Sequence, residues 1–186
     1  MTTPTSVDEL FALYEARGHE HYGESITQIE HALQTAALAS RARASDTLIV
    51  AALFHDVGHL VVDVQASPSF DLGSDDDDHE AVGARVLSPI VGAGVAQPVA
   101  LHVTAKRWRC TREPQYFAAL SAASRATLVA QGGALSEEAC QRFEAHRGFH
   151  DAVALREWDD TGKVPGLDVG TLRQYEEIVR TLAELR

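Results

Sequence analysis

The sequence has 186 residues, of which 45% are hydrophobic and 23% charged, a composition typical of one globular domain. Its net charge of −11 argues against binding to nucleic acid, because phosphate backbones would repel such a chain. No apolar run reaches the length that a bilayer-spanning helix needs, and the first residues show no signal-peptide pattern.

Apolar residues recur at helical spacing along almost the whole chain, so we expect an all-α, single-domain helical bundle over residues 1–186. The first helix is predicted over residues 7–16. The second is predicted to begin at Ser25, because Gln28 three residues later completes a capping-box pattern, and to end near Ala42.

The third helix is predicted over residues 47–57, with Asp46 as its N-cap and Gly58 as the residue that ends it. Its apolar run TLIVAALF could also form a buried strand. The length of the run and its two flanking residues favour a helix.

A long loop is predicted over residues 61–78, and it ends in the acidic run Asp75 to Asp78. This run is either a solvated surface or a negative rim that attracts a cationic substrate. Asp78 is also placed to cap the next helix. That helix is predicted at 79–87, closed by Pro89, and the later helices at 96–105, 114–120, 122–131, 137–147, 149–158 and 171–185.

The adjacent pair His55-Asp56 is the most informative feature, because it stands in an otherwise apolar helix. Burying both side chains is costly unless they are hydrogen-bonded or bound to a metal ion. A hydrogen-bonded helix end is the structural alternative. Other candidate ligands stand at apolar or helix-end positions, and each alone could be structural: His31, His79, His102 and Asp159. This set of imidazoles and carboxylates suits iron, manganese or zinc better than calcium or magnesium.

The order of these residues resembles the HD-domain superfamily of all-helical metalloproteins, and His79 and His102 resemble the additional ligands of its two-metal members. Six blocks between about residues 20 and 166 are similar to a narrower group: GESITQIEHALQTA, AALFHDVGH, HEAVGA, HVTAKRW, LSAASRATLVAQGG and LREWDDTGKVPG. These blocks resemble the PhnZ-type oxygenases, which are mixed-valent diiron enzymes that cleave the carbon–phosphorus bond of 1-hydroxy-2-aminoethylphosphonates.

The resemblance implies a centre of two iron ions in the Fe(II)/Fe(III) state. One iron is expected to bind His31, His55, Asp56 and Asp159, and the other His79 and His102, with Asp56 bridging both. The phosphonate group is expected to contact His59, Lys106, Ser124, Gln131 and Arg156. Glu24 is expected to face the amino end of the substrate. The resemblance therefore predicts four catalytic residues, Asp56, Glu24, His59 and Lys106.

Spacing supports two of these assignments. Lys106 lies one helical turn after His102, and Arg156 lies three residues before Asp159, so each cation shares a helix face with a candidate ligand. Two simpler interpretations stay open. Lys106 could be one more solvated charge in the stretch KRWR, and Arg156 could form a salt bridge with Asp159 or Asp160.

The sequence departs from the family pattern at His21, where a tyrosine commonly serves as a displaceable iron ligand. Either His21 or Tyr22 takes that role here, or the displaceable ligand is absent. This departure and the acidic run Asp75 to Asp78 are both expected near the amino end of the substrate. They favour a trimethylammonio substrate over the primary amine.

The resemblance thus predicts an oxygenase that uses O2 to cleave the C–P bond of (R)-1-hydroxy-2-(trimethylammonio or amino)ethylphosphonate, releasing phosphate and glycine betaine or glycine. We expect a cytoplasmic protein, because Cys110 and Cys140 form no CxxC pair. No nucleic-acid or membrane partner is expected. Two alternatives remain: an HD-family metal-dependent phosphohydrolase acting on a small phosphomonoester or nucleotide, and an HD module that binds a ligand without turnover.

Overall fold

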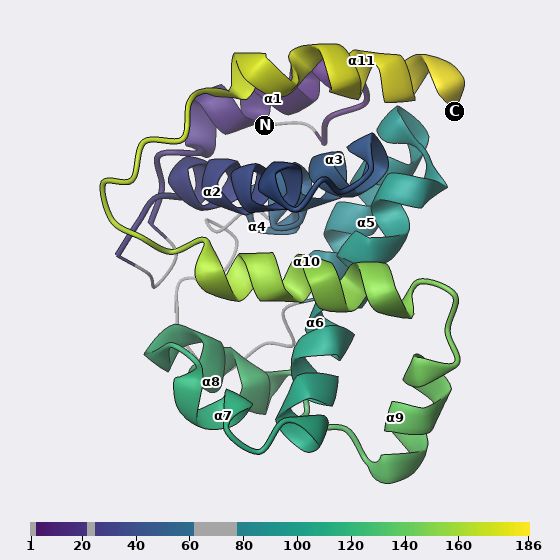
Figure 1. Cartoon of the computed structure of the whole chain (residues 1–186). Helices are drawn as coiled ribbons and strands as arrows, with labels where there is room; N and C mark the ends of the chain where they lie inside the picture. Colours follow the sequence, from purple (N-terminus) through teal and green to yellow (C-terminus); the bar gives the residue numbers. More distant parts are fainter. Residues whose placement is uncertain (1–2, 22–24, 62–77) are drawn as a thin grey trace.

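The computed structural model describes residues 3–21, 25–61 and 78–186, and within these ranges every regular element is helical (Figure 1). The prediction of an all-α fold is therefore confirmed. The helices are α1 (Val7–Arg17), α2 (Gln28–Arg41), α3 (Asp46–Phe54), α4 (Val57–Val61), α5 (His79–Val91), α6 (Ala93–Arg112), α7 (Tyr116–Ala119), α8 (Ala122–Ala130), α9 (Glu137–Glu144), α10 (Phe149–Thr161) and α11 (Glu176–Leu185), with a 3₁₀ turn at Leu172–Tyr175.

Helix α10 crosses the middle of the molecule, with α2 and α3 on one side and α6 on the other (Figure 1). Helix α5 packs along α6 and also against α4. Helices α1 and α11 cover the outer side of this group, where α11 packs on α3 and α5. This arrangement brings side chains from distant parts of the sequence to one internal site.

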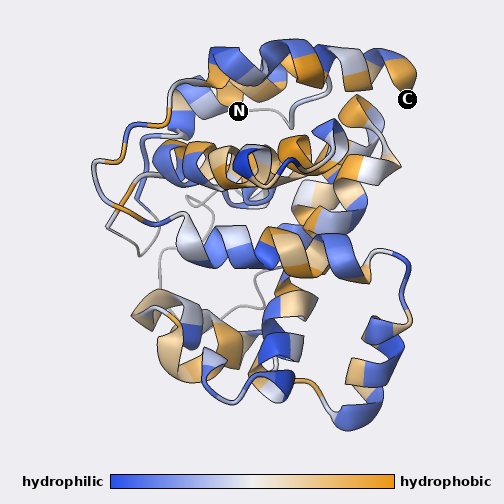
Figure 2. Cartoon of the chain, in the orientation of Figure 1, coloured by the Kyte–Doolittle hydropathy of each residue, from blue (hydrophilic) through white to orange (hydrophobic). Residues whose placement is uncertain are grey.

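Helix α3 is the most hydrophobic element, and its residues from Leu48 to Phe54 are all buried (Figure 2). Each Leu, Ile, Val or Phe side chain among them contributes about 1.5–3 kcal/mol to stability when it is fully buried. Helix α9, by contrast, is largely hydrophilic and lies at the edge of the molecule. The His-Asp pair therefore follows directly after the best-anchored helix of the core.

The start of α2 differs from the prediction by two residues. Thr27, and not Ser25, is the N-cap, and its capping-box partner is Glu30. The Glu30 carboxylate accepts from the Thr27 backbone N–H at 2.8 Å, and the Thr27 hydroxyl accepts from Glu30 N–H at 3.3 Å. A carboxylate accepts more strongly than an amide oxygen, which explains why Glu30 displaces Gln28 from this role.

The predicted third helix is divided in two at the His-Asp pair. Helix α3 starts after the N-cap Ser45 and ends at Phe54, and α4 begins at Val57. The prediction that Gly58 ends a helix is wrong, since Gly58 lies inside α4. A Cβ atom there would be 2.0 Å from the backbone oxygen of His79, so glycine lets α4 and α5 approach closely.

Helices α5, α6 and α10 each extend at least three residues beyond their predicted bounds. Helix α5 continues through Pro89, because its packing along α6 outweighs the local cost of proline. Helix α6 extends from Ala93 to Arg112, on both sides of the predicted range. Helix α10 continues to Thr161, which places Asp159 inside its last turn. Asp78 stands at the N-cap of α5 but makes no capping hydrogen bond, so that part of the prediction is wrong.

Most of the predicted 61–78 loop, including Asp75 to Asp77, lies outside the described residues. The remaining helices agree with the prediction to within a few residues. Among the helices in the described part of the chain, none combines the length and the hydrophobicity that crossing a bilayer requires.

Candidate metal and anion site

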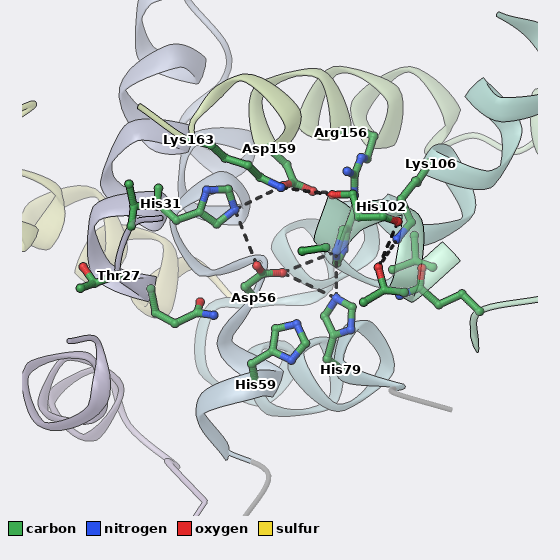
Figure 3. Close-up of a pocket in the computed structure, with 17 residues that line it drawn as sticks. Thr27, His31, Asp56, His59, His79, His102, Lys106, Arg156, Asp159 and Lys163 are labelled. Atoms are coloured by element: carbon green, nitrogen blue, oxygen red, sulfur yellow. Dashed lines mark hydrogen bonds and ion pairs between the residues drawn. The ribbon is translucent and has the colours of Figure 1, made fainter. Parts of the chain in front are cut away.

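The first half of the candidate metal centre joins α2, the end of α3 and α10. His31 Nε2 lies 3.2 Å from His55 Nε2 and 3.2 Å from Asp159 Oδ1 (Figure 3). The Oδ2 atom of Asp56 lies 3.4 Å from His55 Nε2 and 3.7 Å from His31 Nε2. Two ligands that bind one ion at about 2.1 Å and at right angles are about 3 Å apart, so this spacing fits a shared metal ion.

The second half joins the start of α5 to the middle of α6. His79 Nε2 lies 3.2 Å from His102 Nε2. The other carboxylate oxygen of Asp56, Oδ1, lies 3.6 Å from His79 Nε2 and 3.7 Å from His102 Nε2. Asp56 thus presents one oxygen to each half, which is the arrangement of a bridging carboxylate.

The imidazole rings are oriented by hydrogen bonds on their far side. The Nδ1–H groups of His31, His55 and His102 donate to the backbone oxygens of Gly162, Ala52 and Val99, at 2.9, 2.9 and 2.7 Å. This directs the Nε2 atoms of the paired rings toward one another. Once both rings are neutral, their Nε2 atoms can bind one cation between them, so the donor set itself fits metal ions.

Both carboxylates of the centre are held in their ionised form. Burial raises the pKa of Asp56, but the neighbouring His55, His59 and His79 outweigh this and keep it far below its usual range. Burial also raises the pKa of Asp159, and Arg156 and Lys163 bring it well below its usual range. Ionised carboxylates are the form that binds metal.

The two halves differ electrostatically. Burial lowers the pKa of His55, but Asp56 and Asp159 outweigh it and raise the value to about 9. Burial and the nearby His79 and His55 instead hold the pKa of His102 well below its usual range. The half that contains Asp159 is therefore the more attractive one for a cation.

A candidate anion-binding wall lies beside the candidate metal centre, between α6, α8 and α10. Lys106 is buried, and its ammonium donates to Thr127 Oγ1 at 3.0 Å. Ser124 and Gln131 are also buried and line the same cavity, and the Oε1 atom of Gln131 has no hydrogen-bond partner among the described residues. Because Lys106 faces the cavity, the interpretation as a solvated surface charge is wrong.

Arg156 is bound on three sides by protein groups. Its Nη1 lies 2.7 Å from Asp159 Oδ2, its Nη2 pairs with Asp160, and its Nε donates to Tyr116 Oη at 3.0 Å. The salt bridges considered as the simpler interpretation are thus present. Arg156 also lines the cavity, so its remaining N–H donors can reach an anion there.

His59 lines the cavity, as expected for a residue that contacts the phosphonate, but it also lies beside two candidate metal ligands. It is buried in α4 and stacks on His79, with ring centroids 4.0 Å apart. Its ring nitrogen also lies within 4.8 Å of ligand atoms of Asp56 and His79. His59 could therefore bind metal as well as substrate.

Most of the residues predicted near the amino end of the substrate lie outside the described residues. Glu24 and Tyr22 lie outside the described residues. His21 is exposed and is not among the side chains that line the cavity. The side chains that do line it are Ile26, Thr27, Gln28, His31, Asp56, His59, His79, His102, Val103, Lys106, Ala123, Ser124, Thr127, Gln131, Arg156, Asp159 and Lys163.

Seven of these lining residues were missed from the sequence, and four of them are polar: Thr27, Gln28, Thr127 and Lys163. Lys163 follows Arg156 and Asp159 at helical spacing, and this pattern was hidden by the helix end predicted at residue 158. Gln28 was assigned to a capping box that Glu30 occupies. Thr127 carried no signal beyond its position in an apolar helix.

Comparison with known proteins places these residues in a family context. The HD domain family matches residues 29–152, a range that includes every candidate ligand except Asp159. The chain is 42% identical over 178 residues to a protein of Gimesia maris named hydroxymethylphosphonate dioxygenase, covering 96% of this chain and 88% of the relative. It is 32% identical over 179 residues to a Leisingera caerulea protein named 1-hydroxy-2-(trimethylamino)ethylphosphonate dioxygenase (glycine-betaine-forming), covering 96% and 90%.

Proposed function

The chain belongs to the HD-domain family and to its phosphonate dioxygenases, and we propose that it is an iron-dependent oxygenase cleaving the C–P bond of a 1-hydroxyalkylphosphonate. The observation that carries this proposal is the bridging position of Asp56, with one oxygen toward each pair of imidazoles. A centre of two metal ions beside a cationic wall suits a small anionic substrate and O2.

We propose two iron ions as the cofactor. The first would be held by His31, His55, Asp56 and Asp159, and the second by Asp56, His79 and His102. Iron bound there would supply the redox chemistry that lets O2 oxidise the carbon that carries the hydroxyl group. A C–P bond lacks the alkoxide leaving group of a phosphate ester, so oxidation of that carbon is what allows phosphate to leave.

The protein's own residues orient the substrate and neutralise its charge. The Lys106 ammonium and the remaining Arg156 donors would bind the phosphonate oxygens, with Ser124 as a further hydrogen-bonding group. The buried ion pairs of Arg156 with Asp159 and Asp160 keep this wall fixed before substrate arrives. Placing the reacting carbon beside the metal centre is therefore the main contribution of the wall.

The substituent on the hydroxyl-bearing carbon distinguishes three candidate substrates. The trimethylammonio and amino compounds follow from the sequence, and hydroxymethylphosphonate follows from the Gimesia maris relative. The lining side chains in the described ranges include imidazoles but no Phe, Tyr or Trp. A trimethylammonium group binds well against the faces of Phe, Tyr or Trp rings. Because the described lining has none of these rings, it favours hydroxymethylphosphonate as a second candidate substrate.

The proposal is tested by measuring phosphate release from all three compounds with iron-loaded protein, in air and without O2. Stoichiometric O2 uptake with phosphate release is expected for at least one compound. The phosphohydrolase alternative predicts anaerobic phosphate release from a phosphomonoester, and a ligand-binding module predicts binding without turnover.

A cytoplasmic location forms part of the proposal, and the free thiols of Cys110 and Cys140 support it.

A further inference from the structure

Lys163 lies just beyond α10 and lines the same cavity as Lys106. Its ammonium is 3.4 Å from Ser124 Oγ and 3.6 Å from Asp159 Oδ1. In the view of Figure 3, Lys163, Asp159, Arg156 and Lys106 follow one another along one wall. Lys163 therefore touches both a candidate metal ligand and a candidate anion-binding residue.

The two oxygens of Asp159 have different surroundings. Arg156 holds Oδ2 at 2.7 Å, whereas Oδ1 lies 3.2 Å from His31 Nε2 and faces the first half of the metal centre. Lys163 contacts this same Oδ1 atom at the longer distance of 3.6 Å. A metal cation bound at Oδ1 would repel the ammonium and weaken its contact with Asp159.

The charge balance of the wall also favours a second cation that binds the anionic substrate. Arg156 is already paired with two carboxylates, Asp159 and Asp160. Lys106 donates to a neutral hydroxyl, that of Thr127, and so brings an uncompensated positive charge to the cavity. A phosphonate dianion is better neutralised by a second such charge, and Lys163 is the remaining lysine or arginine among the described lining residues.

We propose that Lys163 is a substrate-binding residue whose ammonium leaves Asp159 when the metal is bound and pairs with the phosphonate group next to Ser124. This inference rests on the proposed function for the identity of the anion. It adds Lys163 to the residues expected to bind the phosphonate. It also explains why the cavity carries a lysine on each side of the Arg156–Asp159 pair.

A lysine that merely positions Asp159 would have a different effect. Its removal would alter the carboxylate that binds metal and so lower the iron content or iron affinity. The affinity of iron-loaded protein for an anion would stay the same. Measuring iron content and anion affinity separately therefore distinguishes a binding role from a positioning role.

The test is calorimetric titration of iron-loaded, anaerobic protein with methylphosphonate, which has the phosphonate group but no hydroxyl to be oxidised. In Lys163→Met the Kd should rise about tenfold, or about 1.4 kcal/mol, with iron content unchanged. Lys163→Arg should keep most of the affinity, because it keeps the charge. Arg125→Met is the matched control, since Arg125 is exposed on α8 beside Ser124 and its removal also costs one positive charge.

An unchanged methylphosphonate Kd in Lys163→Met would overturn the proposal, whether or not iron is lost. An equal loss of affinity in Arg125→Met would also overturn it, because the effect would then be one of net charge. If Lys163→Met does not fold, Lys163→Gln serves the same comparison. The titration needs no turnover, so its failure would leave the oxygenase function standing, and absence of O2 uptake would leave the binding result standing.

Discussion

The two halves of the candidate metal centre are built from similar side chains but differ in charge and in anchoring. The half with His31 and His55 has both rings held by backbone carbonyls and has Asp159 as its own carboxylate. In the other half, His102 is held in the same way, whereas the far nitrogen of His79 faces Glu80 at 3.5 Å. We infer that the half with Asp159 binds its metal more tightly.

The largest effect is expected where the two halves meet. Asp56→Asn should remove the shared negative charge and leave neither half with its full ligand set. Activity should fall more than about 100-fold, the upper end of the effect of losing a group that only orients a ligand. Iron content and O2 uptake are the measurements, and Asp151→Asn, an exposed position on α10, is the control. Retention of two irons in Asp56→Asn would refute the bridging role.

A smaller effect is expected when a ligand of only one half is removed, because only the iron of that half should be lost. His79→Ala should lose the second iron and keep the first, because His31, His55, Asp56 and Asp159 remain. Metal analysis should give about one iron per chain, whereas His150→Ala, at an exposed position, should keep the wild-type content. Loss of both irons from His79→Ala would show that the halves do not differ as proposed.

The anion wall should respond to pH through Lys106. Burial, followed by the nearby Arg156, lowers the pKa of Lys106 to about 8. The ammonium is therefore present below this pH and lost above it, so anion affinity should decline as the pH rises through about 8, by up to tenfold per unit. Lys106→Arg keeps its charge throughout this range. Methylphosphonate titrations of both proteins that decline in parallel would contradict this assignment.

The smallest effect is expected from a residue that only positions the wall. Tyr116 accepts a hydrogen bond from Arg156 Nε at 3.0 Å and donates one to Asp160 at 2.5 Å. Tyr116→Phe should cost about 0.5–1.5 kcal/mol in kcat/KM, which is roughly two- to tenfold, and leave iron content unchanged. Tyr175→Phe, a buried tyrosine of the distant α11 side, is the matched control. Equal losses in the two variants would point to general destabilisation.

Local patterns in the sequence were sufficient for the helical class, whereas the grouping of the ligands followed from the resemblance to the HD-domain superfamily. The His-Asp pair in an apolar helix and the histidines at helical positions all come together as expected. The break between α3 and α4 could not be predicted, because it depends on the close approach of Gly58 to α5. Asp159 was predicted at a helix end, and its contacts with Arg156, His31 and Lys163 explain its burial within α10.

The central claim is tested most directly by anomalous X-ray diffraction at the iron edge from crystals of the iron-loaded protein. The account predicts two iron peaks, one beside His31 and His55 and the other beside His79 and His102, with Asp56 between them. A single peak after iron saturation, or a second peak bound by His59 in place of His102, would contradict it.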